Sequence, residues 1–261
     1  MTALRSSLLT DAGFEHGFGT KRSTPDDLPE DVHILKQVHG ERIVVLTGEP
    51  GARSQEPGEN RRPETRTVTK VPLVDERPGK DRCLEVRSLP EKPFRFDEGD
   101  ALVTDIQGVS LGIRTADCLP VMVGDRGTGA VAAIHCGWRS LALGLAEKGV
   151  RVLMDLTGSG PEDLLAALGP SIGPCCYEVG EDVRRAFHTA GESNNPVQVR
   201  ENRLYLDLAE EAKNQLLAAG ISPGNIEKIP GCTSCDEDRF WSWRARKEKE
   251  RMVAFIKAHV N

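Results

Sequence analysis

The sequence lacks the long apolar runs that membrane and secreted proteins carry. None approaches the roughly 20 apolar residues that cross a bilayer, and the first ten residues have no apolar core long enough for a signal peptide. Its seven cysteines are an odd number, which argues against a secreted disulfide framework. We therefore expect a soluble, cytoplasmic protein with reduced thiols.

The sequence also lacks a cationic surplus. Its net charge is -6 and its pI about 5.6, whereas binding to nucleic acid through bulk electrostatics needs a clustered cationic surface. There is no internal repeat, no G-x-G-x-x-G and no P-loop. We expect a small-molecule ligand, with neither nucleic acid nor a membrane as partner.

The order of the predicted elements favours an α+β fold. Four strand-like runs come together before the first long helix, so the chain is not a regular alternation of strands and helices. The predicted strands are 42–46, 101–104, 110–114, 120–123 and 130–134, and the predicted helices are 138–157, 181–190 and 208–219. We expect residues 1–261 to form a single domain with mixed β-sheets flanked by helices.

One stretch, at about 48–98, differs from the rest in composition. It is dense in charge, proline and glycine and has no apolar period, which is typical of a long flexible insertion. Within it, 67–71 and 83–86 alternate like strands, so a hairpin added to a sheet edge is the alternative.

Two strand-like segments each carry a residue type that binds metals. Cys118 precedes one and His135 ends the other, 17 positions later, a spacing that only a folded sheet brings together. Each residue has a plainer interpretation: Cys118 as a buried thiol and the earlier His39 as a surface histidine at a turn. Arg139 follows His135 in the first turn of a predicted helix, which suits phosphate or an ordinary ion pair.

Three further segments could carry chemistry. The loop 169–178 is rich in glycine and proline and could wall a pocket, and for its adjacent Cys175 and Cys176 a structural role is favoured. Cys232 and Cys235 form a C-x-x-C without a second half, so we expect neither a metal nor a redox role there. Residues 240–244 predict a core strand that offers aromatic rings beside the cation Arg244.

Together these segments resemble the YfiH family, also called the multicopper polyphenol oxidase or laccase-domain family. The matching motifs lie in the family's order at 16–21, 37–40, 115–121, 135–139, 169–180, 232–233 and 240–244. The resemblance implies a YfiH-like fold and a zinc ion held by His39, Cys118 and His135, with copper as a possible alternative. Three protein ligands leave a fourth position open, as in catalytic sites.

The resemblance also implies two activities. One is phosphorolysis of adenosine, inosine, guanosine and S-methyl-5'-thioadenosine to the base and a pentose 1-phosphate, and the other is deamination of adenosine. Cys118 and Asp117 are the expected catalytic residues, Asp117 as a proton carrier. Lys21 and Arg139 are the expected phosphate contacts, and Arg244 an expected contact to base or sugar. The expected partners are therefore purine nucleosides and phosphate, with the protein a monomer or a homodimer.

The sequence departs from the family pattern in four places. Cys136 replaces the usual alanine and would put a second thiol beside the metal, and Lys21 replaces the common arginine. The stretch 21–37 is short, and 48–98 is long. Three other functions remain open: a copper-dependent polyphenol oxidase, a metal- or nucleoside-binding protein without turnover, and a cysteine hydrolase that pairs Cys118 with His135.

Overall fold

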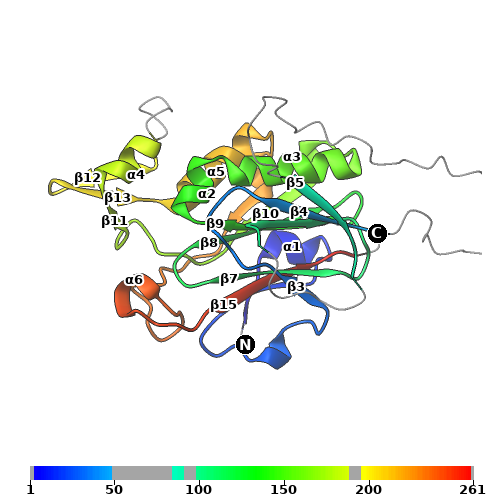
Figure 1. Ribbon diagram of the computed structural model, residues 1–261, viewed down its shortest axis with the longest axis horizontal. Helices are drawn as coiled ribbons and strands as arrows, with labels where there is room; N and C mark the ends of the chain where they lie inside the picture. Colours follow the sequence, from blue (N-terminus) through cyan, green and yellow to red (C-terminus); the bar gives the residue numbers. More distant parts are fainter. Residues whose placement is uncertain (1–2, 49–83, 91–97, 188–194, 260–261) are drawn as a thin grey trace, which may run out of the picture.

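Two sheets packed face to face, with helices over one of them, form the body of the protein (Figure 1). The computed structural model describes residues 3–48, 84–90, 98–187 and 195–259. The larger sheet has the order β14-β10-β8-β9-β6-β4-β5 and mixes parallel and antiparallel pairs. Its strands are β4 (Ile43–Thr47), β5 (Leu84–Ser88), β6 (Ala101–Thr104), β8 (Leu119–Asp125), β9 (Val131–Cys136), β10 (Leu164–Leu168) and β14 (Ile226–Lys228).

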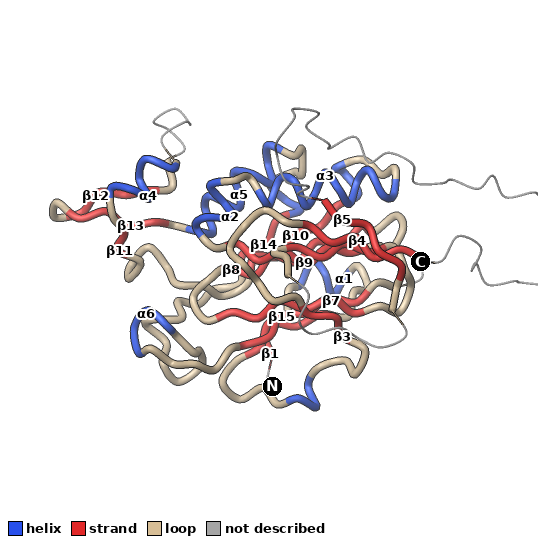
Figure 2. The backbone as a smooth tube through the Cα atoms, viewed as in Figure 1, coloured by secondary structure: helices blue, strands red, loops and turns tan. Residues whose placement is uncertain are grey.

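The second sheet has the order β1-β2-β15-β7-β3. Its strands are β1 (Ala3–Leu4), β2 (His16–Gly19), β3 (Val32–Ile34), β7 (Ser110–Thr115) and β15 (Met252–Lys257). A small antiparallel sheet of β11 (Glu178–Val179), β12 (Val197–Arg200) and β13 (Arg203–Leu206) projects from the body beside α4 (Figure 2).

Helices α2 (Trp138–Ala142), α3 (Leu145–Thr157) and α5 (Leu208–Ala218) lie over the outer face of the larger sheet (Figure 1). The remaining helices are α1 (Ser7–Asp11), α4 (Glu181–Ala186) and α6 (Trp243–Arg246), with 3-10 turns at Pro25–Asp27, Pro161–Asp163 and Pro223–Asn225. No helix in the described part of the chain is both long and apolar enough to span a membrane.

Strand β9 shows how the two layers share the core. Its residues Ala132, Ile134 and Cys136 pack in the apolar cluster beneath the helices, whereas Val131 and Ala133 pack in the cluster between the sheets. Successive side chains of a strand point to opposite faces, so every second residue enters each cluster. His135 therefore lies on the opposite face from Cys136.

The α+β prediction and the five predicted strands are confirmed, and the helix 208–219 matches α5. The single helix 138–157 is wrong: it is divided into α2 and α3 at Gly144, whose φ of 76° is left-handed. The predicted strand at 240–244 is also wrong, because α6 begins at Trp243. Of the predicted helix 181–190, α4 ends at Ala186, and 188–190 lie outside the described residues.

The segment 48–98, expected to be a flexible insertion, contains an ordered strand near its C-terminal end. Residues 84–88 form β5, which pairs in parallel with β4 at the edge of the larger sheet. An edge strand is thus present, and its partner among the described residues is β4. The 67–71 segment of the expected hairpin lies outside the described residues. In the short stretch 21–37, the chain forms a 3-10 turn and strand β3.

Candidate metal centre and pocket

A pocket of about 640 Å³ opens where the ends of β3, β7 and β9 meet α6. Its volume is in the range of small-molecule sites. The walls come from segments far apart in the sequence, which only the sheet topology brings together. The lining residues lie at 35–37, 39, 114–118, 135, 138–139, 177, 243–244, 249 and 251.

The three predicted metal ligands come together in this pocket. One ligand atom each of His39, Cys118 and His135 can be chosen so that all lie within 4.8 Å of one another. The Cys118 Sγ lies 3.9 Å from the His39 Nε2. Two imidazoles and one thiol are a donor set that zinc accepts. The residues present therefore fit a metal ion, and their role as its ligands stays a prediction.

Asp100, which the sequence did not single out, fixes two of these three residues. Its buried Oδ1 lies 2.9 Å from the His135 Nδ1 and accepts the backbone N–H of His39 at 2.9 Å, and its Oδ2 accepts that of Gly40. With Nδ1 bound, the His135 Nε2 is left for a ligand. Burial opposes ionisation of this carboxyl, but the hydrogen bonds from His135 and the backbone lower its pKa.

The sequence holds only part of the signal for Asp100. This residue stands directly before the apolar strand β6, and a carboxylate buried at a strand end must be paired. Its partners, however, are 35 and 61 positions away, so no local pattern names them.

The Cys118 thiol and the His135 imidazole favour each other's charged form. Burial disfavours the Cys118 thiolate, but the adjacent His135 and His39 outweigh it and lower the pKa of Cys118 to about 6. Burial likewise opposes the His135 imidazolium, yet Cys118 and Asp100 raise its pKa to about 9. The thiolate is the form in which cysteine binds metals or attacks substrates.

Gly137 leaves room between the three candidate ligands. A Cβ at this position would lie 3.2 Å from the His39 Cδ2, 3.4 Å from the Cys118 Sγ and 3.8 Å from the His135 Cε1. A side chain here would press on the His39 ring and contact Cys118 and His135. The glycine between β9 and α2 leaves this space open.

Asp117 is tied into the pocket wall by hydrogen bonds. Its Oδ1 accepts the hydroxyls of Thr233 and Ser242, each at 2.7 Å, and its Oδ2 accepts the backbone N–H of Arg244 at 2.6 Å. Its φ is 94°, unusual for a residue with a side chain. These contacts favour a positioning role for Asp117, and the predicted proton transfer stays a prediction.

Two of the three predicted substrate-binding cations line the pocket. The Arg139 guanidinium lies 4.5 Å from the Trp138 ring, and that of Arg244 lies 5.1 Å from the Tyr177 ring. Within the described residues, Lys21 is not part of the lining. Its ammonium pairs with Glu248 at 2.9 Å.

A known protein family covers most of this chain. A family model described as "Multi-copper polyphenol oxidoreductase laccase" matches residues 23–259. The chain belongs to this family. The resemblance to YfiH proteins, drawn from the motifs, is thereby confirmed.

Curated relatives in this laccase-domain family carry two activity names. The chain is 36% identical to "Purine nucleoside phosphorylase YfiH" of Escherichia coli (strain K12) over 176 residues, which are 66% of this chain and 69% of that protein. It is 35% identical over 178 residues to "Adenosine deaminase RL5" of an unknown prokaryotic organism, which covers 67% of this chain and 65% of that protein.

The laccase-domain fold also matches a solved structure. The crystal structure of YlmD from Geobacillus stearothermophilus aligns with a TM-score of 0.74 and 27% identity, and the match covers 99% of this chain and 97% of that one. The YfiH-like α+β fold expected from the sequence is therefore confirmed.

Cys136 does not lie beside the candidate metal centre, which corrects our expectation for this departure from the family pattern. The thiol is fully buried in the cluster beneath the helices, because it points to the face of β9 opposite His135. Burial raises its pKa well above the usual range. It acts as a small apolar side chain in the core.

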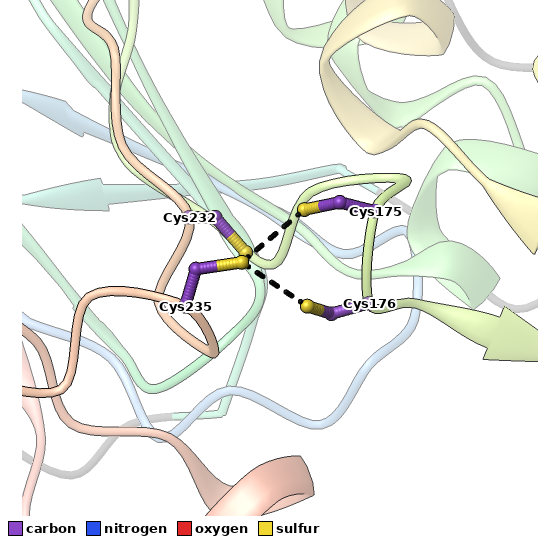
Figure 3. A group of neighbouring side chains, drawn as sticks. All are labelled: Cys175, Cys176, Cys232 and Cys235. Carbon is purple, nitrogen blue, oxygen red and sulfur yellow. Dashed lines mark hydrogen bonds between the residues drawn. The ribbon is translucent and has the colours of Figure 1, made fainter.

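The C-x-x-C does have a second half, contrary to our expectation. The structure brings Cys232 and Cys235 against the adjacent pair Cys175 and Cys176 (Figure 3), and the four sulfur atoms lie within 4.8 Å of one another. The sequence gives no sign of this grouping, since the two pairs are almost 60 residues apart.

Proposed function

We propose that the protein is a zinc-dependent purine nucleoside phosphorylase that also deaminates adenosine. The observation that carries this proposal is one pocket that combines a two-histidine, one-cysteine donor set with arginine side chains and aromatic rings. The names of the relatives support the reaction class. The proposed substrates are adenosine, inosine, guanosine and S-methyl-5'-thioadenosine.

His39, Cys118 and His135 would hold the metal, and Asp100 would orient His135 and the backbone at His39. When bound, zinc with three protein ligands supplies a Lewis acid with an open coordination position. Cys118 is in this proposal a ligand. The lowered pKa of its thiol favours that role, because the thiolate is present near neutral pH.

Phosphorolysis requires an anion beside C1' of the sugar while the purine leaves. Arg139 and Arg244 are the proposed cations for phosphate and sugar, and Arg114, Lys249 and Arg251 add positive charge to the same lining. Trp138 and Tyr177 offer ring faces on which a purine could stack. Lys21 stays a predicted phosphate contact that would have to leave Glu248.

A copper oxidase of the multinuclear type fits the donor set less well. Such enzymes need several histidine-rich ligand sets. Among the described residues, His16 sits between the backbone of Ser6 and that of Phe14, and His259 packs on the Phe14 ring. Of the histidines in the described ranges, only His39 and His135 line the pocket.

The decisive experiment measures base release from inosine with and without phosphate. The zinc-loaded protein should release hypoxanthine and ribose 1-phosphate only when phosphate is present, and should convert adenosine to inosine without it. His39→Ala should abolish both reactions, whereas His259→Ala, a histidine outside the pocket, should keep them.

Three results would contradict the proposal. Nucleoside binding without product, in metal-replete protein, would indicate a binding protein. Phenol oxidation with several tightly bound coppers would indicate the oxidase. Full phosphorolysis by Cys118→Ala would exclude Cys118 both as a ligand and as a nucleophile.

A further inference from the structure

We propose that Cys175, Cys176, Cys232 and Cys235 hold a second, structural zinc ion that fastens the wall of the pocket. This site is separate from the proposed catalytic metal and goes beyond the proposed function. It takes one residue pair from each of two irregular loops, 169–177 and 229–236 (Figure 3).

The sulfur positions suit a tetrathiolate site. The Cys235 Sγ lies 3.5 Å from that of Cys175 and 3.2 Å from that of Cys176, and all four lie within 4.8 Å of one another. Four sulfurs about 2.3 Å from a tetrahedral zinc would be spaced at about 3.8 Å. A disulfide needs about 2.05 Å, so both sulfur pairs would have to close further to form one.

Backbone N–H groups point at one of these sulfurs. The Gly173 N–H donates to the Cys232 Sγ at 3.2 Å, and the backbone of Ser234 and Cys235 donates to the same atom. Such donors stabilise a thiolate, the form of cysteine that binds zinc. The loops are thus shaped around an anionic sulfur.

Two arginine side chains hold the loops that carry the four cysteines. Four thiolates around Zn²⁺ carry a net charge of about −2. Arg246 donates to the carbonyl oxygens of Thr233 and Ser234, each at 3.3 Å, and Arg200 donates to that of Pro174. Both guanidinium groups therefore contact the loops that carry the sulfurs.

The cluster is joined to the pocket on both sides. Tyr177, next to Cys176, lines the pocket, and Thr233, next to Cys232, donates to Asp117. An ion that links the two loops would hold both contacts in place. Loss of this structural ion should therefore raise the KM for nucleoside more than it lowers kcat.

The test is the zinc content per chain together with the absorption spectrum after exchange to Co²⁺. Wild type should bind two zinc ions. Cys118→Ser should keep one, with the intense thiolate-to-cobalt bands of a four-sulfur site. Cys235→Ser should also keep one, but with the weak thiolate bands of a site that has a single sulfur. Ser234→Ala, in the same turn, should keep two.

Cys118→Ser protein without any zinc would overturn the second site, whether or not wild type is a phosphorylase. A wild-type thiol titration gives a second measure that does not depend on a variant folding. Five thiols that become reactive only after a chelator is added, Cys118 and the four of the cluster, would support the site, and so would four if only the cluster holds zinc. Thiols found paired as disulfides, or equally reactive without chelator, would overturn it.

Discussion

Among single residues, Asp100 is not a proposed ligand of the catalytic metal, but it contacts two residues that are, His39 and His135. Replacing it by asparagine should weaken metal affinity by about ten- to a hundredfold, the usual loss when a carboxylate behind a histidine ligand is removed. The amide keeps the size of the side chain but can no longer accept from both backbone N–H groups and from His135. Competition with a chelator of known affinity measures the change.

Asp125→Asn is the matched control for Asp100→Asn. Asp125 is also fully buried and also accepts two backbone N–H groups, those of Gly127 and Thr128, but it lies outside the pocket. The Asp125→Asn substitution should lower the thermal stability of the protein and leave its metal affinity unchanged. Equal metal affinity in Asp100→Asn and wild type would show that Asp100 does not position the ligands.

The sequence reveals the candidate ligand residues but not their surroundings. His39, Cys118 and His135 could be named from motifs, whereas Asp100 could not, because its role depends on pairings made by the sheet. Cys136 illustrates the opposite case. Alternation along β9 already puts it on the other face from His135, so strand geometry could have corrected the expectation of a second thiol at the site.

At the scale of elements, Glu227 on β14 fastens the first helix to the larger sheet. Its Oε2 accepts the hydroxyls of Ser6 and Ser7 and the backbone N–H of Leu8 at the start of α1. Burial raises the pKa of Glu227, but these hydrogen bonds outweigh it, and the net effect is a lowered pKa. A carboxyl whose pKa is lowered by folding stabilises the fold above its unfolded pKa.

This stabilisation should be lost as the pH falls from about 4.5 through the lower pKa of the folded state. Glu227→Gln cannot titrate, so its melting temperature should fall less steeply than that of wild type on acidification. Glu15→Gln, an exposed glutamate 3.9 Å from Lys257, is the control and should follow wild type. Parallel curves for wild type and Glu227→Gln would contradict the assignment.

Element boundaries were predicted best where the pattern is local. Strand β6 follows from a short, wholly buried run, and helix α5 from apolar residues at helical spacing. The break between α2 and α3 depends on a left-handed Gly144, and a glycine inside a helical period does not reveal its φ. Strand β5 was predicted only as the alternative to a flexible insertion, because its short, half-exposed sequence is fixed by pairing with β4.

At the scale of the whole molecule, the sequence predicted the class of fold and the family but not which loops meet. Mixed sheets follow from the order of strands and helices. The four-cysteine cluster and the hydrogen bonds of Asp117 join segments from 60 to more than 120 residues apart, which no spacing rule connects. These long-range contacts build the pocket wall.

Asp117 offers the sharpest test of that wall, since it links the turn before β8 to the 229–236 loop and to α6. If it positions the wall, Thr233→Val and Ser242→Ala should behave like Asp117→Asn. Each should raise the KM for inosine several-fold, leave the pH profile of kcat unchanged and lower the free energy of unfolding by about 1–2 kcal/mol. Steady-state kinetics across pH and denaturant unfolding measure these effects.

If Asp117 acts as the predicted proton carrier, the same three variants should give a different result. Asp117→Asn alone would then lose deamination and one limb of its pH profile, while Thr233→Val and Ser242→Ala, which keep the carboxylate, would retain both. We expect the shared KM effect, because the hydroxyls of Thr233 and Ser242 and the N–H of Arg244 already occupy both carboxylate oxygens. A carboxylate held in this way orients the loops and has little freedom to exchange a proton with substrate.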